Sequence, residues 1–444
     1  MGAFIRTTEE NLFISDSQSL SENDEFEDVP YCDSSIKSHS AKLVKQDISK
    51  YNHSLKQHSR LATNKPWHPH NLRKIGPDSS WLMPIGRLPH IEAGIMWTGV
   101  YRRMPIMIFS AKSMITQSDS VRYLGEAFSM TYKLIRTDCK LLKRLLHSHG
   151  FQESSFVSAE YNILWSGCHL KPFQLRYLSF FHKVNHFPRS YELTRKDRLA
   201  KNIQKMQQLK GTRHFDLLPH SYILPAEFQD FCSYYSKDKG PYIVKPIASS
   251  RGRGIYLSSH PDQLPLDEPA IVSKYISNPL LIDGFKFDLR LYVAVTSYDP
   301  LCIYVYEEGL ARFATVRYQN GAKFMNYQCM HLTNYSVNKR NQDFVQNDNA
   351  DIEDFGNKWS LGALLRYLRD EHKDITGLMM RIEEIIIKAF ISVEMPINAA
   401  CNLIQGHKTN CYELYGFDII VDDKLRPWLL EVSIVTLVYV ILPI

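Results

Sequence analysis

Residues Tyr242–Leu257, YIVKPIASSRGRGIYL, are the stretch of the sequence that decides the fold. Their β-branched and aromatic residues predict one strand that ends at Lys245-Pro246, and Ile255–Leu257 predicts a second strand. The loop between them contains two glycines, which let the backbone approach a ligand closely, and two arginines, which offer forked hydrogen-bond donors. With the positive charge of Lys245, this composition favours a hairpin that covers phosphate groups. A solvated surface hairpin is the alternative, and it is the commoner meaning of such a loop by itself.

The familiar phosphate-binding signatures are missing from the sequence. It contains no G-x-x-x-x-G-K-[ST], and its glycine-rich loop lacks the full G-x-G-x-x-G of protein kinases. No H-R-D-x-x-x-x-N catalytic loop follows, which disfavours a protein kinase. The function of the hairpin must therefore be inferred from residues downstream of it.

Composition and charge bound the class of protein. The chain has 444 residues, of which 44% are hydrophobic, so it can bury a large core in two to three domains. Residues 171–213 contain eleven lysines and arginines against two acidic residues, whereas Ser21–Ser34 is acidic. A concentrated basic segment indicates an acidic partner, either nucleic acid or an acidic protein surface. An ordinary solvated helix face is the alternative.

The cysteines and the chain ends indicate the compartment. The eight cysteines are scattered without a C-x-x-C pair, which is typical of reduced intracellular thiols. The N-terminus has no apolar signal core, and Arg6 stands where a myristoylation signal needs Ser or Thr. The apolar run from Val432 to the end has thirteen residues, short of the roughly 20 that span a bilayer. These features predict a cytoplasmic protein without a membrane span.

Hydrophobic periodicity predicts an α+β chain after a disordered polar segment at residues 1–80. Helical spacing occurs in Val121–His149, in the basic stretch 192–213, and in Lys358–Arg369 and Thr376–Ile397. The predicted strands are Asn162–Trp165, Tyr242–Val244, Ile271–Ile276, Phe285–Val295, Cys302–Tyr306 and Ala311–Val316, followed by a hairpin of Tyr415–Val421 with Trp428–Val432.

Charged residues occur at unusual positions in two of these strand regions. Lys286, Asp288 and Arg290 share one side of a strand, which is costly on an inward face unless each is paired or bound to a ligand. In the last hairpin Asp418 and Glu431 are expected to face each other among apolar neighbours. Two facing buried carboxylates repel, so a cation between them is expected, and oxygen ligands near phosphates favour Mg²⁺. An edge strand and a surface hairpin are the respective alternatives.

The remaining polar motifs complete a pattern that a nucleotide-dependent ligase requires. His331–Ser336 is a cluster of short hydrogen-bonding side chains, Arg312 follows Gly309-Leu310-Ala311, and Lys358 stands at the predicted start of a helix. Each feature alone is unremarkable. Together with the lysines, the arginines and the facing carboxylates, they indicate binding of a nucleotide and activation of an acid.

These residues resemble the tubulin–tyrosine-ligase-like family of ATP-grasp ligases. The resemblance rests on several short motifs in the same order, over about residues 155–432: NHFPRSYELTRKDRLAKNI, IVKPIASSRGRGIYL, SKYISNPLLIDGFKFDLRLYV, YEEGLARFATVRY, HLTNYSVNK, FGNKWS and YGFDIIVDDKLRPWLLEV. It is closest to the tubulin polyglutamylases, and among them to member five of the family. The resemblance implies an ATP-grasp fold with an N-terminal domain at 81–190, a central domain at 191–284 and a C-terminal domain at 285–444.

The resemblance also implies an activity, in which ATP phosphorylates a glutamate side chain in a tubulin tail and free L-glutamate then attacks the acylphosphate. The implied ATP-binding residues are Lys245, Arg251, Gly252, Ser273, Lys274, Tyr275, Ile276, Lys286 and Asp288, with Arg251, Lys286 and Arg290 as the catalytic residues. Of the ATP-binding residues, Ser273–Ile276 are implied to line the adenine slot, with Lys274 near phosphate. The implied glutamate-binding residues are Arg312, Thr333, Asn334, Tyr335, Ser336 and Lys358. Asp418, Glu431 and Ser433 are implied to bind Mg²⁺.

The implied partners are the C-terminal tails of α/β-tubulin and microtubules, which give the basic stretch 171–213 an acidic protein partner in place of nucleic acid. Arg312 favours glutamate over glycine or tyrosine, because a second carboxylate needs a fixed cation. We expect a monomer in the cytoplasm, on the cytoskeleton, at a cilium basal body or at a centrosome. A catalytically inactive microtubule-binding form is the alternative.

One departure from the family pattern supports that alternative. The family's metal motif is Glu-x-Asn, whereas Ser433 stands at the second position here, and a serine hydroxyl is a weaker ligand than an amide carbonyl. The resemblance ends at Val432, and residues 433–444 form an apolar tail. We interpret the C-terminal part as truncated, either as an alternative product or as an error in the gene assignment.

Overall fold

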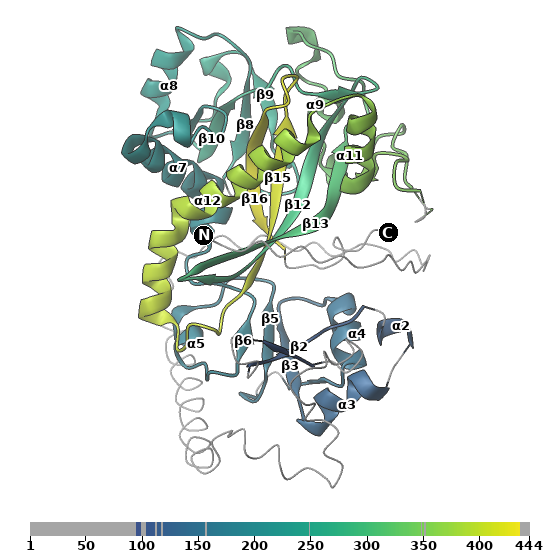
Figure 1. Cartoon of the computed structure of the whole chain (residues 1–444). Helices are drawn as coiled ribbons and strands as arrows, with labels where there is room; N and C mark the ends of the chain where they lie inside the picture. The colour runs from purple at the N-terminus through teal and green to yellow at the C-terminus, as the bar shows by residue number, and fades with distance from the viewer. Residues whose placement is uncertain are drawn as a thin grey trace, which may run out of the picture. The chain divides into compact units, whose positions relative to one another are not determined.

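The computed structural model describes residues 95–98, 104–111, 113–116, 119–155, 158–247, 249–347, 349 and 352–435 (Figure 1). The segment 1–80 predicted to be disordered, and the tail from residue 436 onward, lie outside the described residues. Among the described residues, one compact unit comprises 134–142 and the chain from Asn162, and a second comprises 95–133 and 143–161. Each unit is described by itself.

The larger unit contains a six-stranded antiparallel sheet with the order β14-β13-β12-β15-β16, in which β11 (Leu281–Ile282) also pairs with β12. Its centre is a long hairpin of β12 (Phe285–Tyr298) and β13 (Leu301–Phe313), beside which lies the hairpin of β15 (Glu413–Val421) and β16 (Pro427–Ile434). The predicted terminal hairpin is therefore confirmed. The edge strand is β14 (Lys358–Ser360).

The prediction of two strands at Cys302–Tyr306 and Ala311–Val316 is wrong, because Cys302–Tyr306 and Ala311–Phe313 belong to the single strand β13, which ends at Phe313. In the structure Gly309 pairs with Leu291, next to an irregularity of the ladder. A Cβ atom on Gly309 would lie 2.7 Å from the carbonyl oxygen of Arg290. Glycine here permits a close approach of two strands and does not end one.

Two helices follow β14 along the chain, α11 (Leu361–Asp370) and α12 (Ile375–Ile404). The prediction that a helix begins at Lys358 is wrong, since Lys358 lies in β14 and Ser360 is the N-cap, whose side chain accepts a hydrogen bond from the backbone N–H of Ala363. Helix α12 extends past its predicted end at Ile397. The apolar side chains that it buries follow the helical period, as packing on a core requires: Leu378, Ile382, Ile385, Ile386, Ala389, Phe390, Val393, Ile397 and Ala400.

The second sheet of this unit has the order β7-β10-β8-β9 and is antiparallel. Its strands are β7 (Ser221–Leu224), β8 (Tyr242–Pro246), β9 (Tyr256–Ser258) and β10 (Ala270–Lys274). The pairing of Ile243 with Leu257 confirms the hairpin predicted from Tyr242–Leu257.

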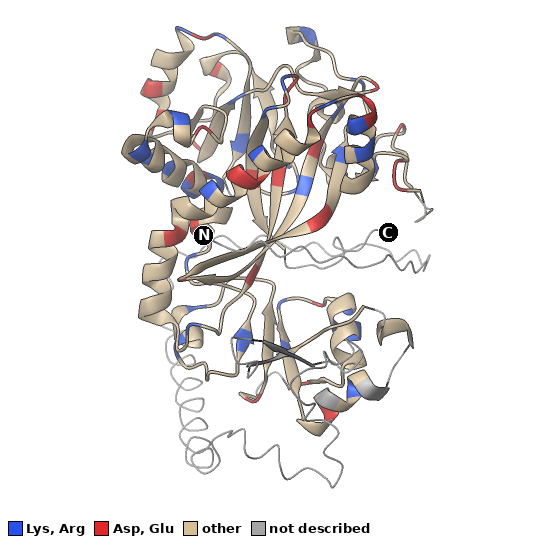
Figure 2. Cartoon of the chain, in the orientation of Figure 1, with Lys and Arg blue, Asp and Glu red and all other residues tan. Residues whose placement is uncertain are grey.

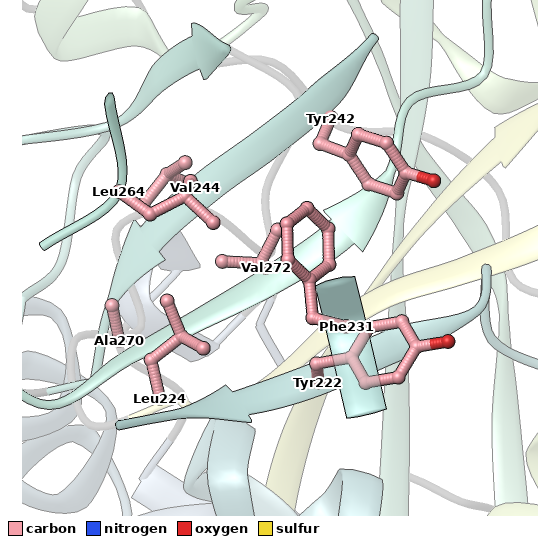
Figure 3. Close-up of a cluster of buried hydrophobic side chains, with 8 residues drawn as sticks. All are labelled: Tyr222, Leu224, Phe231, Tyr242, Val244, Leu264, Ala270 and Val272. Carbon is pink, nitrogen blue, oxygen red and sulfur yellow. The ribbon is translucent and has the colours of Figure 1, made fainter. Parts of the chain in front are cut away.

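Alternate residues of this sheet enter two different cores. Figure 3 shows one core, in which Tyr222 and Leu224 of β7 meet Phe231 of α8 (Phe228–Tyr235). The residue between them, Ile223, packs on the other side with Ala200 of α7 (Lys196–Lys210). The period of two along the strand therefore places one helix on each face of the sheet.

The basic stretch 192–213 does not form one helix. It contains the end of α6 (Tyr191–Thr194), the whole of α7, and the short 3₁₀ helix η5 (Thr212–His214), with Arg195 extended between α6 and α7. The other elements before β7 are β5 (Ile163–Ser166), α5 (Pro172–Arg176) and β6 (Lys183–Val184), and β5 pairs with β6 in parallel.

The helical spacing in Val121–His149 belongs to two helices, α3 (Asp119–Ala127) and α4 (Lys140–Ser148), with β3 (Thr131–Ile135) between them. Ser129 and Arg136 adopt positive φ on either side of β3, which neither a helix nor a strand permits in its interior. Apolar spacing alone did not reveal these two turns. The remaining elements before β5 are β1 (Ile95–Thr98), β2 (Met104–Met107), α2 (Ser113–Thr116) and β4 (Gln152–Glu153). Among the described residues, every helix is too short or too polar to cross a membrane.

Candidate active site

A pocket within the larger unit collects residues from both of its sheets. The apolar part of its lining is Leu199, Leu218, Ile243, Ile255, Ile271, Ile276, Leu332, Ile420, Leu429 and Leu430. The charged part is Lys196, Lys245, Lys274, Lys286, Asp288, Asp418 and Glu431. An apolar wall suits a base ring, and a cluster of lysines beside carboxylates suits the phosphates of a nucleotide and their counter-ion.

Two lysines from different elements meet Glu431 in this pocket. Lys196, the first residue of α7, places Nζ 3.5 Å from Glu431 Oε2 and donates to the carbonyl oxygen of Ser249 over 2.8 Å. Lys245 of β8 donates to the carbonyl oxygen of Leu430 over 3.4 Å. Burial lowers the pKa of Lys245, an effect that Glu431 opposes and Lys196 reinforces. A polyanion arriving here would relieve the repulsion between the two ammonium groups.

Lys286 of β12 is buried and is held by two oxygen atoms. Its Nζ donates to the hydroxyl of Tyr275 over 3.0 Å and to the carbonyl oxygen of His331 over 2.7 Å. Burial lowers the pKa of Lys286 to about 7, although Asp288 opposes the effect. Tyr275 follows β10 directly, and His331 ends the short helix α9 (Gln328–His331), so three separate segments meet at this ammonium group.

Four charged residues on neighbouring strands form one ion-pair network. Asp288 and Arg290 of β12 lie opposite Arg312 of β13 and Asp418 of β15, respectively. Arg312 Nε donates to Asp288 over 2.9 Å, and Arg312 Nη2 lies 2.9 Å from Asp418 Oδ2. Arg290 donates to both oxygens of Asp418. Burial would raise the pKa of Asp418, but the two guanidinium groups outweigh it and hold that pKa well below its usual value.

The two carboxylates of the last hairpin face each other as expected, because Asp418 pairs with Glu431 in the β15–β16 register. Their charges are offset by protein groups, the arginines at Asp418 and Lys196 at Glu431. A carboxylate offers about four lone-pair positions, and the contacts from Arg290 and Arg312 use three of them on Asp418, which leaves one on Oδ1. With the oxygens of Glu431 in the same pocket, this donor set fits Mg²⁺.

Ser433 is not part of the pocket lining. It pairs with Gly416 across the hairpin, and its Oγ donates to the carbonyl oxygen of Gly416 over 3.4 Å. A Cβ atom on Gly416 would lie 3.1 Å from Ser433 Oγ and from Arg290 Cδ. The missing Cβ therefore makes room for both side chains at this position.

The loop that was predicted to cover phosphates has a left-handed backbone at Arg251 (φ 60°), Gly252 (φ 81°) and Gly254 (φ 68°). A Cβ atom on Gly252 would come within 2.8 Å of Val337 Cγ2 and 3.0 Å of Asn334 Oδ1. Glycine at position 252 therefore allows the loop to pack against α10 (Tyr335–Asn338). Arg251 itself is exposed and does not line the pocket.

The residues implied for the adenine slot, Ser273–Ile276, all line the pocket. Ser273 Oγ is 2.8 Å from Ser221 Oγ, beside the apolar wall. The ammonium group of Lys274 pairs with Asp238, whereas the hydroxyl of Tyr275 contacts Lys286. In this structure Tyr275, and not Lys274, is the member of the motif beside the buried lysine.

The residues implied for glutamate are divided between the pocket and its surroundings. Thr333 and Asn334 line the pocket, and Tyr335 on α10 is exposed. Lys358 of β14 pairs with Arg312 of β13, and burial lowers the pKa of Lys358. Ser336, on α10, is half-buried.

Sequence reasoning missed Lys196, Ser221 and the side chain of His331 as site residues. Lys196 was one cation among eleven in the basic stretch, and no spacing singled it out. His331 was recognised only as part of the cluster His331–Ser336. A search for buried polar residues at element ends would have favoured His331, whereas the sequence contains no signal for Ser221.

A second group of possible metal ligands, His169, His186 and Glu413, lies away from the lining of this pocket. Glu413 already accepts hydrogen bonds at both oxygens, from His186 Nδ1, Ser190 Oγ, the Phe187 N–H and the Tyr415 hydroxyl. The other ring nitrogen of His186 faces the carbonyl oxygen of Ser166 over 2.9 Å. Because the ligand atoms of His186 and Glu413 are used by protein groups, this cluster is a structural polar core.

Residues 174–435 match the tubulin-tyrosine ligase family. The chain belongs to that family. Its fold is accordingly the ATP-grasp type expected from the sequence, with mixed α/β content and antiparallel sheets.

Several members of the family with assigned activities are similar to the chain in sequence. The chain is 57% identical over 340 residues to tubulin polyglutamylase TTLL5 of Mus musculus. This alignment covers 77% of the chain and 26% of the relative. It is 38% identical over 353 residues to tubulin polyglutamylase ttll-5 of Caenorhabditis elegans (75% and 48%), and 38% identical over 306 residues to tubulin monoglutamylase TTLL4 of Homo sapiens (68% and 25%). The chain thus spans about a quarter of the length of mouse TTLL5 and of human TTLL4.

Proposed function

We propose that this chain is an ATP-dependent ligase that joins L-glutamate to side-chain carboxylates of glutamates in tubulin C-terminal tails. The family match and the names of the relatives support it. The observation that carries it is the pocket itself, where Lys196, Lys245 and Lys286 converge from three elements beside Asp418 and Glu431. Lysines for a triphosphate beside carboxylates for its metal are the parts that phosphoryl transfer requires.

The proposed reaction has two steps. In the first, a tail carboxylate attacks the terminal phosphorus of ATP, which releases ADP and leaves an acylphosphate. In the second, the amine of free glutamate attacks the acyl carbon, phosphate leaves, and an amide bond forms with loss of a proton. Lys245 and Lys286 would bind the triphosphate, and Arg290 and Arg312 would offset the charge of acylphosphate and incoming glutamate. Mg²⁺ held by Asp418 and Glu431 would supply charge neutralisation at the phosphates.

The acidic substrate has a complementary face on α7, which begins at the pocket with Lys196. Arg198, Lys201 and Lys205 are exposed and recur at helical spacing, and Figure 2 shows lysines and arginines along this helix. The only acidic residue of α7, Asp197, pairs with Arg195. We therefore propose that α7 binds the tubulin tail. From the family relationship we further propose that the protein acts on the cytoskeleton as a monomer, at sites such as basal bodies or centrosomes.

Incorporation of labelled glutamate into microtubules with Mg-ATP tests the proposal, with a Ser433→Asn variant run beside the unmodified chain. Incorporation by the unmodified chain would establish a ligase that tolerates serine beside its metal ligands. Incorporation by the variant alone would favour the inactive microtubule-binding form, which Ser433 motivates. Absence of incorporation in both, with normal ATP binding, would contradict the proposed activity of this chain.

A further inference from the structure

The ammonium group of Lys286 is one end of a buried hydrogen-bond chain. The hydroxyl of Tyr275, which accepts from Lys286, lies 2.8 Å from His331 Nδ1, and His331 Nε2 lies 2.9 Å from the carbonyl oxygen of Phe324. The side chains of Tyr275, Lys286 and His331 are each at most 6% exposed. The chain therefore runs from the pocket into the segment that contains η7 (Ala322–Phe324) and α9.

The partners fix the direction of every bond in this chain. A carbonyl oxygen only accepts, so His331 Nε2 carries a proton and donates to Phe324. Burial lowers the pKa of His331, which favours the neutral ring and leaves Nδ1 as an acceptor. Burial raises the pKa of Tyr275, so its hydroxyl keeps its proton and donates to Nδ1. The oxygen of Tyr275 then accepts from Lys286, and the hydroxyl of Tyr318 is a further neighbour of the Tyr275 hydroxyl.

A lysine side chain is long and flexible, and its ammonium group has three donors. Here two of them are used by Tyr275 and by the carbonyl oxygen of His331, which leaves one for a ligand. We propose that Tyr275 and His331 are positioning residues that hold the Lys286 ammonium group for the triphosphate of a nucleotide. This inference rests on the proposed nucleotide site.

A purely structural role for the same bonds has different consequences. If Tyr275 and His331 only tied the end of β10 to α9, their loss would disturb the whole pocket, including its apolar wall. If they position Lys286, their loss would affect only ligands that carry phosphate. Comparing ATP with adenosine, which has the base and ribose but no phosphate, separates the two roles.

The test is calorimetric binding of Mg-ATP and of adenosine to the full chain and to four variants. Tyr275→Phe removes only the hydroxyl, and His331→Leu removes the acceptor for that hydroxyl. His331→Asn retains an acceptor near the Nδ1 position. Tyr235→Phe is the matched control, because its hydroxyl donates to Ser259 and Tyr235 does not line the pocket.

We expect Tyr275→Phe and His331→Leu to weaken Mg-ATP binding about tenfold, as loss of a hydrogen bond to a charged group does, while adenosine binding changes less than about twofold. His331→Asn should restore most of the affinity, and Tyr235→Phe should match the unmodified chain. Equal weakening of both ligands, or unchanged Mg-ATP binding, would overturn the inference and leave the proposed function standing. Failure of the unmodified chain to bind Mg-ATP would overturn both.

Discussion

At the scale of single residues, the charge of Lys286 depends on pH near neutrality. Its neighbours are Asp288, which favours the ammonium form, Lys245, which disfavours it, and the neutral Tyr275 and His331. Since its pKa is lowered to about 7, the group is charged at pH 6 and largely neutral at pH 8.5. A bound triphosphate favours the charged form, so binding above pH 7 must take up a proton.

We therefore predict that the affinity for Mg-ATP falls as the pH rises from 6 to 8.5, by at most about tenfold per pH unit for one proton. The nucleotide also titrates in this range, so Lys286→Arg, whose guanidinium does not titrate, is the reference. Calorimetry at several pH values in buffers of different ionisation enthalpy measures both the affinity and the proton uptake. Identical pH profiles for the two proteins would refute the prediction.

Arg312 stabilises two buried carboxylates and is also proposed to bind glutamate, so its removal would affect stability and activity together. It pairs with both Asp288 and Asp418, so Arg312→Ala would leave two buried carboxylates short of a partner and lower the stability by about 3–5 kcal/mol. Arg312→Lys keeps a positive charge but loses the several N–H donors with which the guanidinium group contacts Asp288 and Asp418. We predict that Arg312→Lys folds, binds Mg-ATP normally, and raises the KM for glutamate at least about tenfold. Steady-state kinetics with glutamate varied at saturating ATP would decide, and a matching rise in the KM for ATP would contradict the assignment.

At the scale of elements, the junction of β14 and α11 corrects the sequence prediction and can be tested directly. Ser360 ends the strand and caps the helix through its bond with the N–H of Ala363. We predict that Ser360→Ala lowers the free energy of unfolding by about 1 kcal/mol and that Ser360→Asp, another good cap, restores it. Urea unfolding followed by far-UV circular dichroism measures both. No loss in Ser360→Ala would mean that the helix does not depend on this cap.

Other strands show where the sequence predicted the fold correctly and where it did not. The β8–β9 hairpin and the facing pair Asp418 and Glu431 were predicted, because alternating apolar residues fix which side chains share a face. The single strand β13 was predicted as two strands, and the close approach of β12 that Gly309 permits can be recognised only when the partner strand is known.

The ion-pair partners of the site residues were harder to predict than the strands that carry these residues. A cation was expected between Asp418 and Glu431, yet Arg290 and Arg312 already offset the charge of Asp418, and this depends on strand order. Lys196 enters the site only because α7 begins at the pocket. Long-range pairing of this kind has no local signature.

At the scale of the whole molecule, the pocket joins two sheets of one compact unit, so a nucleotide should stabilise both together. A ligand at a hundred times its dissociation constant stabilises the native state by about 2.7 kcal/mol. We predict that Mg-ATP raises the melting temperature and slows hydrogen exchange in β8–β9 and in β15–β16. Lys245→Met is the matched variant, because methionine fills a similar volume without a buried charge. Its melting temperature without ligand should equal or exceed that of the unmodified chain, whereas the increase with Mg-ATP should be lost. Slower exchange in only one of the two hairpins would mean that the nucleotide contacts a single sheet, and the proposed site would then be wrong.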